Sequence, residues 1–160
     1  MVRFELTEDI AAPIERCFDL ARSVDLHVKT ALRTHEQAVA GCTSGLIGPG
    51  ETVTWRGKHF GLWFFHTSRI TAFDRPRYFQ DSMLKGSFKH YQHGHVFHSQ
   101  DGKTQMTDIV EFEAPYGILG RVAERVFLER HLKDFVRQRN AHIKRIAESG
   151  EWSRLVSSST

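Results

Sequence analysis

FQDSMLKGSFKHYQHGHVFHSQDGKTQMTDIVEF, residues 79–112, predicts two successive β-hairpins that share one face. Asp101-Gly102 lies between two alternating runs, which is a strong signal for a two-residue hairpin turn. Counting back from this turn predicts four facing pairs: Gln100 with Lys103, Phe97 with Met106, His95 with Asp108 and His93 with Val110. Aromatic rings, imidazoles and a carboxylate on one face are typical of the wall of an apolar cavity with polar spots.

Strand and helix signals continue on both sides of these hairpins. Alternation predicts a first strand at residues 2–7, Pro13 fits the first turn of a short helix, and Ser23 can cap a second helix through roughly residue 31. Further strands are expected at residues 35–40, 51–58, 62–73, 78–84, 90–98 and 104–113. After Pro115, apolar residues recur with helical spacing over residues 117–148, which predicts one long amphipathic helix.

This order of elements predicts an α+β fold. Consecutive strands with short links form an antiparallel sheet, and a long amphipathic helix must bury its apolar stripe against that sheet. We expect one domain over residues 1–148 and a flexible tail over residues 149–160, with the terminal SSST disordered. A sheet that curls around one helix leaves space for a pocket between them.

The composition excludes several classes of protein. With 40% hydrophobic and 26% charged residues, the chain is neither disordered nor fibrous. It has no run of 18 apolar residues that would span a membrane, and MVRFELTEDI lacks the apolar core of a signal peptide, so we expect a cytoplasmic location. Cys17 and Cys42 are expected to be buried free thiols. The net charge of +3 is concentrated over residues 121–145, but without any nucleic-acid-binding motif this predicts a solvated helix face.

Three segments carry a resemblance to a known superfamily: GETVTWRGKHFGLWF, YFQDSMLKGSFKHYQHGHVF and MTDIVEFEAPYGILGRVAERVF. They resemble the START-like, or SRPBCC, superfamily, closest to its bacterial branch of polyketide cyclase-like and ligand-binding proteins. The resemblance covers residues 1–148 and implies a helix-grip fold, in which a seven-stranded sheet wraps the C-terminal helix around a hydrophobic cavity. Lipid carriers, hormone receptors and aromatase/cyclases share that fold, so the fold alone fixes no activity.

Two acids lie near the imidazoles of the predicted face. The turn before residue 90 brings Asp81 opposite Tyr91 or His93, so we expect an Asp81–His93 pair beside an Asp108–His95 pair. A buried carboxylate needs a donor partner, which such pairs would supply. Three interpretations stay open: a satisfied structural network, the polar end of a ligand site, or a general acid–base pair. The candidate catalytic residues are His93, His95, Asp81 and Asp108.

A metal site is weakly indicated. His93 and His95 lie on one strand face, and with Asp81 or Asp108 they form a two-histidine, one-carboxylate set. In a chain with ten histidines this spacing is a poor signal, so no metal is expected. The glycine-rich residues 41–50 contain no phosphate-binding pattern, so no cofactor is expected either.

The leading hypothesis is a protein that binds a small apolar or amphipathic molecule between the sheet and the C-terminal helix. A polyketide cyclase- or dehydratase-like enzyme is the first alternative, and a non-catalytic interaction module is the second. Trp63 and Phe65 are expected on the outer face, where they favour a possible homodimer. The side chains expected in the ligand site are Trp55, Phe64, His66, Phe79, Asp81, Met83, Tyr91, His93, His95, Phe97, Asp108, Val122 and Val126.

Overall fold

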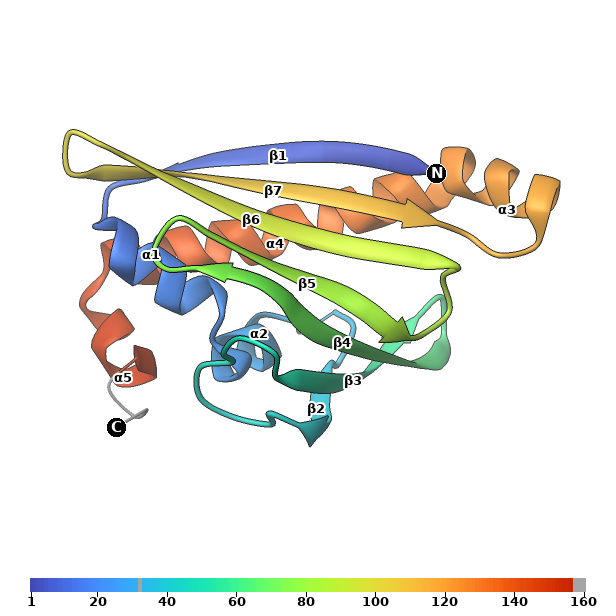
Figure 1. The fold of residues 1–160 in the computed structure, drawn as a ribbon, viewed down its shortest axis with the longest axis horizontal. Helices are drawn as coiled ribbons and strands as arrows, with labels where there is room; N and C mark the ends of the chain where they lie inside the picture. Colours follow the sequence, from blue (N-terminus) through green and yellow to red (C-terminus); the bar gives the residue numbers. More distant parts are fainter. Residues whose placement is uncertain (32, 157–160) are drawn as a thin grey trace.

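The computed structural model describes residues 1–31 and 33–156, so the expected disorder of the terminal SSST lies outside the described residues. Seven strands form one antiparallel sheet in the order β1-β7-β6-β5-β4-β3-β2 (Figure 1). The strands are β1 (Val2–Ile10), β2 (Gln37–Gly41), β3 (Thr52–His59), β4 (Leu62–Asp74), β5 (Tyr78–Lys85), β6 (His90–Gln100) and β7 (Lys103–Glu113). The α+β prediction is confirmed.

Two short helices, α1 (Ile14–Ala21) and α2 (Val24–Thr30), connect β1 to β2 as expected. Pro13 precedes the first helical residue, where its missing N–H costs nothing. The Ser23 hydroxyl accepts a hydrogen bond from the Leu26 amide at 3.2 Å and so caps α2. Both helices therefore begin where the sequence predicts.

The register of the β6–β7 hairpin follows the Asp-Gly turn. Asp101 and Gly102 have φ angles of 51° and 75°, which suits the turn type that two-residue hairpins prefer. All four predicted pairs are present, and Asp81 faces His93 across the β5–β6 pair. These pairings fix which backbone positions are neighbours; the side chain of His93, described below, contacts a residue that is not its backbone partner.

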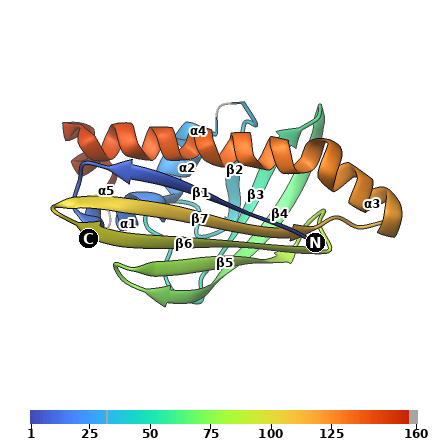
Figure 2. The same ribbon diagram turned by 90° about the horizontal axis from the view of Figure 1, so that it is seen from above.

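The C-terminal helical segment has three parts: α3 (Gly117–Ala123), the π-helical turn η1 (Glu124–Leu128) and α4 (Glu129–Glu148). Helix α4 lies along one face of the sheet, while α3 extends past the end of the strands (Figure 2). The buried Glu124 carboxylate accepts a hydrogen bond from the Ala114 amide at 2.6 Å, which ties the π-helical turn to the end of β7. The predicted single helix is thus continuous, but its register changes at η1.

Two apolar clusters fill the contact between sheet and helices. The larger one joins α1, α2 and the C-terminal half of α4 to the sheet around Phe18. The Phe18 ring makes edge contacts with Phe73, Phe79 and Phe97, with ring centroids 5.3–5.4 Å apart. The smaller one joins Val136 of α4 to β1 and β7. Aromatic edge contacts in a closed core are worth about 0.5–1.5 kcal/mol beyond their burial.

Residues 150–156 fold against the larger cluster, which differs from the flexible tail that we expected after residue 148. They form the 3-10 turn η2 (Gly150–Trp152) and the short helix α5 (Ser153–Val156). Leu155 is buried, and the Arg16 guanidinium lies 4.2 Å from the centre of the Trp152 ring. The prediction of a flexible tail gave weight to the serine and threonine residues of this segment. The contacts with the core come from the apolar side chains at positions 152 and 155.

Other sequence expectations have mixed outcomes. Cys17 is a buried free thiol as predicted, whereas Cys42 is only partly buried. Trp63 and Phe65 are 47% and 58% exposed, in line with the expected outer face. None of the helices in the described part of the chain is long and apolar enough to cross a membrane.

Candidate functional site

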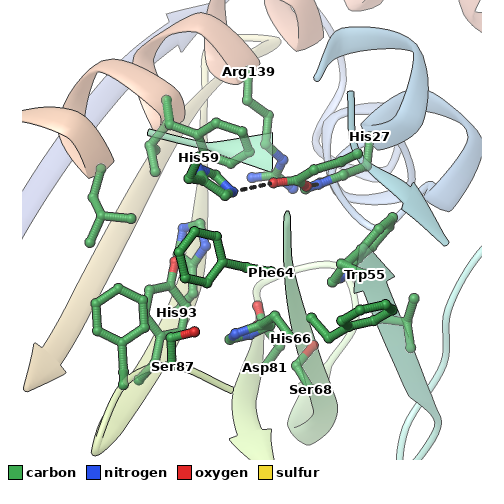
Figure 3. A pocket seen from close by; sticks show the side chains of 18 of the residues that line it. His27, Trp55, His59, Phe64, His66, Ser68, Asp81, Ser87, His93 and Arg139 are labelled. Atoms are coloured by element: carbon green, nitrogen blue, oxygen red, sulfur yellow. Dashed lines mark hydrogen bonds and ion pairs between the residues drawn. The ribbon is translucent and has the colours of Figure 1, made fainter. Parts of the chain in front are cut away.

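A cavity of about 350 Å³ lies between the sheet and the helical layer (Figure 3). Its walls come from β3, β4, β5 and β6 on one side and from α2, η1 and α4 on the other. At one end Phe60 and Phe127 are 59% and 45% exposed, so this end faces solvent. Eight of the residues expected in the ligand site line this cavity: Trp55, Phe64, His66, Phe79, Asp81, Tyr91, His93 and His95.

Three other residues expected in the site do not line the cavity. Phe97 is enclosed in the larger core cluster against Phe18 and Phe79. Met83 packs over Gly86 in the connection between β5 and β6, where its sulfur fills the space beside the glycine. Asp108 is fully buried behind the histidines, so it acts on the cavity only through them.

Val122 and Val126 are not in the cavity wall either; they are 56% and 70% exposed. The reason is that the Glu124 side chain points inward. Each valine is two positions from Glu124, and two positions correspond to a rotation of about 200° around a helix, so both valines lie on the opposite, outer side. After the π-helical turn, the wall is continued by Leu128, His131, Leu132, Phe135 and Val136.

Asp108 is the centre of a connected polar network at the buried end of the cavity. His93 Nε2 donates to Asp108 Oδ1 at 2.7 Å, and His95 Nδ1 lies 2.7 Å from the same oxygen without hydrogen-bond geometry. On its other side, His95 Nε2 lies 3.6 Å from Asp81 Oδ2. Of the two pairs that we predicted, Asp108–His95 is present as a side-chain contact. The Asp81–His93 pair is wrong, because His93 turns toward Asp108 and Asp81 contacts His95 in its place.

Helix α4 contributes two polar side chains to this network. Asn140 Nδ2 donates to Asp108 Oδ2 at 2.6 Å, and Arg139 Nη1 lies 3.6 Å from Asp108 Oδ1. Arg139 Nη2 donates to the Ala21 carbonyl, so the orientation of the guanidinium is fixed. Within the described residues, Arg139 Nη1 has no hydrogen-bond acceptor although it is buried and its side chain lines the cavity. A buried donor without a partner costs about 1–3 kcal/mol, which a ligand oxygen would recover.

The environment sets the charges of the network. Burial opposes the ionisation of Asp108, but the His93 hydrogen bond and the neighbouring His95 hold the pKa of its carboxyl well below the usual value. The same balance between burial and the imidazoles lowers the pKa of Asp81. Burial and the nearby His95 lower the pKa of His93. At neutral pH both carboxyls are ionised and His93 is neutral, which leaves His93 Nδ1 as an acceptor.

A second polar cluster lies on the opposite wall of the cavity. The Glu36 carboxylate contacts His27 Nε2 at 2.5 Å and His59 Nε2 at 3.4 Å, and dashed lines mark these contacts of His27 and His59 in Figure 3. His59 Nδ1 lies 3.0 Å from His131 Nε2. Burial opposes ionisation of Glu36, but His27 and His59 lower its pKa to about 2. The His27 ring also stacks on Trp55 with the centroids 4.1 Å apart. The cavity thus has a polar group at each side and aromatic surface between them.

One set of side chains in the network could hold a metal ion. One donor atom from each of Asp81, His93 and His95 lies within 4.8 Å of the other two. This is the two-histidine, one-carboxylate set noted in the sequence, with Asp81 and not Asp108 as the carboxylate.

Comparisons with known proteins identify the fold. No protein-family model and no curated protein sequence matches the chain. Solved structures do match: the Zhui aromatase/cyclase from Streptomyces sp. R1128 has a TM-score of 0.74 at 18% identity, covering 92% of this chain and 93% of its own. The chain has the helix-grip fold of the START-like superfamily.

Two further matches agree with this START-like fold. A START superfamily protein from Mycobacterium smegmatis has a TM-score of 0.68 at 9% identity, covering 90% of this chain and 98% of its own. Ara h 8.0201 has a TM-score of 0.66 at 16% identity, covering 91% of this chain and 97% of its own. At identities this low, the likeness extends to the fold and not to the residues of the site.

The cavity contains functional candidates that the sequence interpretation missed. Arg139 and Asn140 follow the apolar positions Phe135 and Val136 on the same helix face, so a polar pair inside an apolar stripe was the available signal. His27 lies in α2, Glu36 directly precedes β2, and His59 ends β3. No spacing in the sequence indicates that such residues meet.

Proposed function

We propose that this START-like protein binds a small apolar or amphipathic molecule in the cavity between the sheet and α4. The observation that carries the proposal is a cavity lined mainly by apolar and aromatic side chains, with the Asp108 network and the Glu36 cluster as polar groups in its wall. A volume of about 350 Å³ lies within the range of small-molecule sites, roughly 300–1,000 Å³. Aromatic side chains provide most of the contact, and a few fixed polar groups orient the ligand.

The polar end of the ligand is proposed to lie at the Asp108 network. Arg139 Nη1 lies 3.6 Å from Asp108 Oδ1 and has no hydrogen-bond acceptor among the described residues, while the Ala21 carbonyl fixes the guanidinium through Nη2. His93 Nδ1 is an acceptor. A group with both an acceptor oxygen and a hydroxyl, such as a phenol-ketone or a carboxylic acid, would satisfy both. Trp55, Phe64 and Phe135 would then enclose the apolar part of the molecule.

A fluorescent anilinonaphthalene sulfonate probe tests this proposal, because its rings suit the cavity and its sulfonate suits Arg139. The cavity is blocked with Ser68→Phe, since Ser68 is buried and lines it. Arg69→Leu on the exposed side of the same strand is the matched control. We expect one saturable site in the wild type and in the control, and binding at least about tenfold weaker in the blocked variant. Equal binding in all three folded proteins would refute the proposal.

A second candidate function is proton-transfer catalysis on a carbonyl-containing substrate. The observation that favours it is His93, which is neutral, held by an ionised aspartate and open to the cavity. One structural neighbour is an aromatase/cyclase, which is the class of chemistry that such a base serves. A polyketide-like substrate should give a pH–rate profile with an ascending limb that disappears in His93→Gln, while turnover unaffected by that substitution would remove this candidate.

The interaction module has less support, because it requires a closed, dry core and the space between sheet and helix is open. A homodimer through the exposed Trp63 and Phe65 stays a prediction, as does the cytoplasmic location. The Arg56 guanidinium lies 4.2 Å from the centre of the Trp63 ring, so part of that surface is already covered within the monomer.

A further inference from the structure

Three donor atoms converge on the cavity side of the Asp108 network. Each of Asp81, His93 and His95 offers one donor within 4.8 Å of the others, and Asp81 Oδ2 lies 3.6 Å from His95 Nε2. Two ligands of a tetrahedral zinc ion lie roughly 3.3 Å apart, so small side-chain rotations would complete a site. Asp81 comes from β5 and the histidines from adjacent positions on one face of β6, which makes the backbone frame rigid.

Asp108 prepares both histidines for coordination. It contacts His93 Nε2 and His95 Nδ1, each at 2.7 Å, and this leaves His93 Nδ1 and His95 Nε2 as the nitrogens for a cation. A carboxylate behind a ligating histidine fixes the ring and strengthens it as a donor, and metal sites use this arrangement widely. Here Asp108 does this for His93 through a hydrogen bond and lies 2.7 Å from His95 Nδ1, and Asn140 holds the Asp108 carboxylate in turn.

The formal charges favour a cation at this position. Asp81 and Asp108 carry two negative charges, whereas Arg139 supplies one positive charge, with its Nη1 3.6 Å from Asp108 Oδ1. A buried excess of negative charge is costly unless a cation balances it. The Asp81 side chain is 20% exposed and lines the cavity, so an ion has a route to the three donors.

We propose that Asp81, His93 and His95 bind one divalent first-row transition metal ion at the floor of the cavity. Two imidazoles with one carboxylate suit zinc or iron(II) better than magnesium or calcium, which prefer oxygen ligands. Three protein ligands leave at least one coordination position open, and it faces the cavity. That position would accept an oxygen donor from the bound molecule, a detail that rests on the proposed function, whereas metal binding itself does not.

Cobalt(II) is the probe for the test, because its visible absorption reports the number and kind of ligands. Protein without a polyhistidine tag is stripped with a chelator, titrated with Co²⁺ and then challenged with Zn²⁺. We expect one equivalent of Co²⁺ with nitrogen and oxygen ligation, displaced by one equivalent of Zn²⁺. His93→Gln and His95→Gln should each abolish this spectrum. Asp108→Asn should weaken binding by roughly 10–100-fold, as for other residues behind metal ligands.

Two controls keep the proposal falsifiable. His98→Gln, exposed on the same strand, and His131→Gln, in the Glu36 cluster, should both leave Co²⁺ binding unchanged. Asp81→Asn is the variant that best preserves the fold, because its side chain is partly exposed, and it should lose binding while its melting temperature stays near the wild-type value. Absence of stoichiometric binding, or binding lost only in His131→Gln, would overturn the proposal. Probe binding by the stripped protein tests the cavity separately, so the two proposals can fail independently.

Discussion

The two ends of the C-terminal helical segment differ sharply in what they contact. At the C-terminal end, Ile143 and Ile146 pack into a closed core around Phe18, with α1 and α5 covering it. At the N-terminal end, α3 extends beyond the strands, and η1 and the first turns of α4 face the cavity. One amphipathic segment therefore seals the sheet at one end and leaves it hollow at the other. The sealed end provides stability, which allows the hollow end to retain space for a ligand.

The largest effect is expected from truncating an aromatic ring in each region. Phe18→Ala, at a fully buried position, should lower the free energy of unfolding by about 3–5 kcal/mol. Phe64→Ala, at a partly exposed position in the cavity wall, should cost no more than about 1 kcal/mol, because its ring already borders empty space. Denaturant unfolding of both variants measures the difference, and similar costs would show that the cavity end is as tightly packed as the core.

The next effect is the acid sensitivity of the Glu36 cluster in the cavity wall. The lowered pKa of Glu36, about 2 in the folded protein against 4.5 for an ordinary glutamate, stabilises the fold above pH 4.5. That contribution, about 3 kcal/mol, is lost as the pH falls from about 5 to 2. In Glu36→Gln, the slope of unfolding free energy against pH should flatten over this window.

Glu15→Gln, at an exposed position on α1, is the control for that measurement and should keep the wild-type slope. If Glu36→Gln also keeps the wild-type slope, the carboxylate is not held by the imidazoles of His27 and His59 in solution.

A smaller effect separates the buried stripe of α4 from the exposed surface of α3. Val136→Ala removes two methyl groups at a position that is 1% exposed, and we expect a loss of about 2 kcal/mol. Val122→Ala, at a position that is 56% exposed, should change the free energy of unfolding by less than about 0.5 kcal/mol. Thermal or denaturant unfolding measures both, and a large cost at Val122 would mean that α3 is covered in solution.

Local signals in the sequence account for most of the fold. The Asp101-Gly102 turn requires positive φ at two positions, and once it is placed, the register of β6 and β7 follows without further assumptions. Proline and serine likewise mark the starts of α1 and α2. The π-helical turn has no comparable signal, because it depends on a long-range contact between Glu124 and the Ala114 amide.

The site was less predictable than the fold, for a different physical reason. Register determines which backbone positions are neighbours, but side-chain rotamers decide which groups meet, and His93 turns to Asp108 when Asp81 is its backbone partner. Contributions from α4 were also missed, since Arg139 was grouped with a basic, solvated helix face and Asn140 was not assigned a role. In such sequences, a polar residue within the apolar stripe of a helix is a candidate for the site and not for the solvated face.

Native mass spectrometry of the purified protein tests the central claim most directly, because it detects small molecules that stay bound through purification. The account predicts one co-purified small molecule per chain in the wild type and in Arg69→Leu, and none in Ser68→Phe, whose side chain fills the cavity. A wild-type protein that carries no small molecule and binds no apolar probe, or a molecule retained equally by Ser68→Phe, would contradict it.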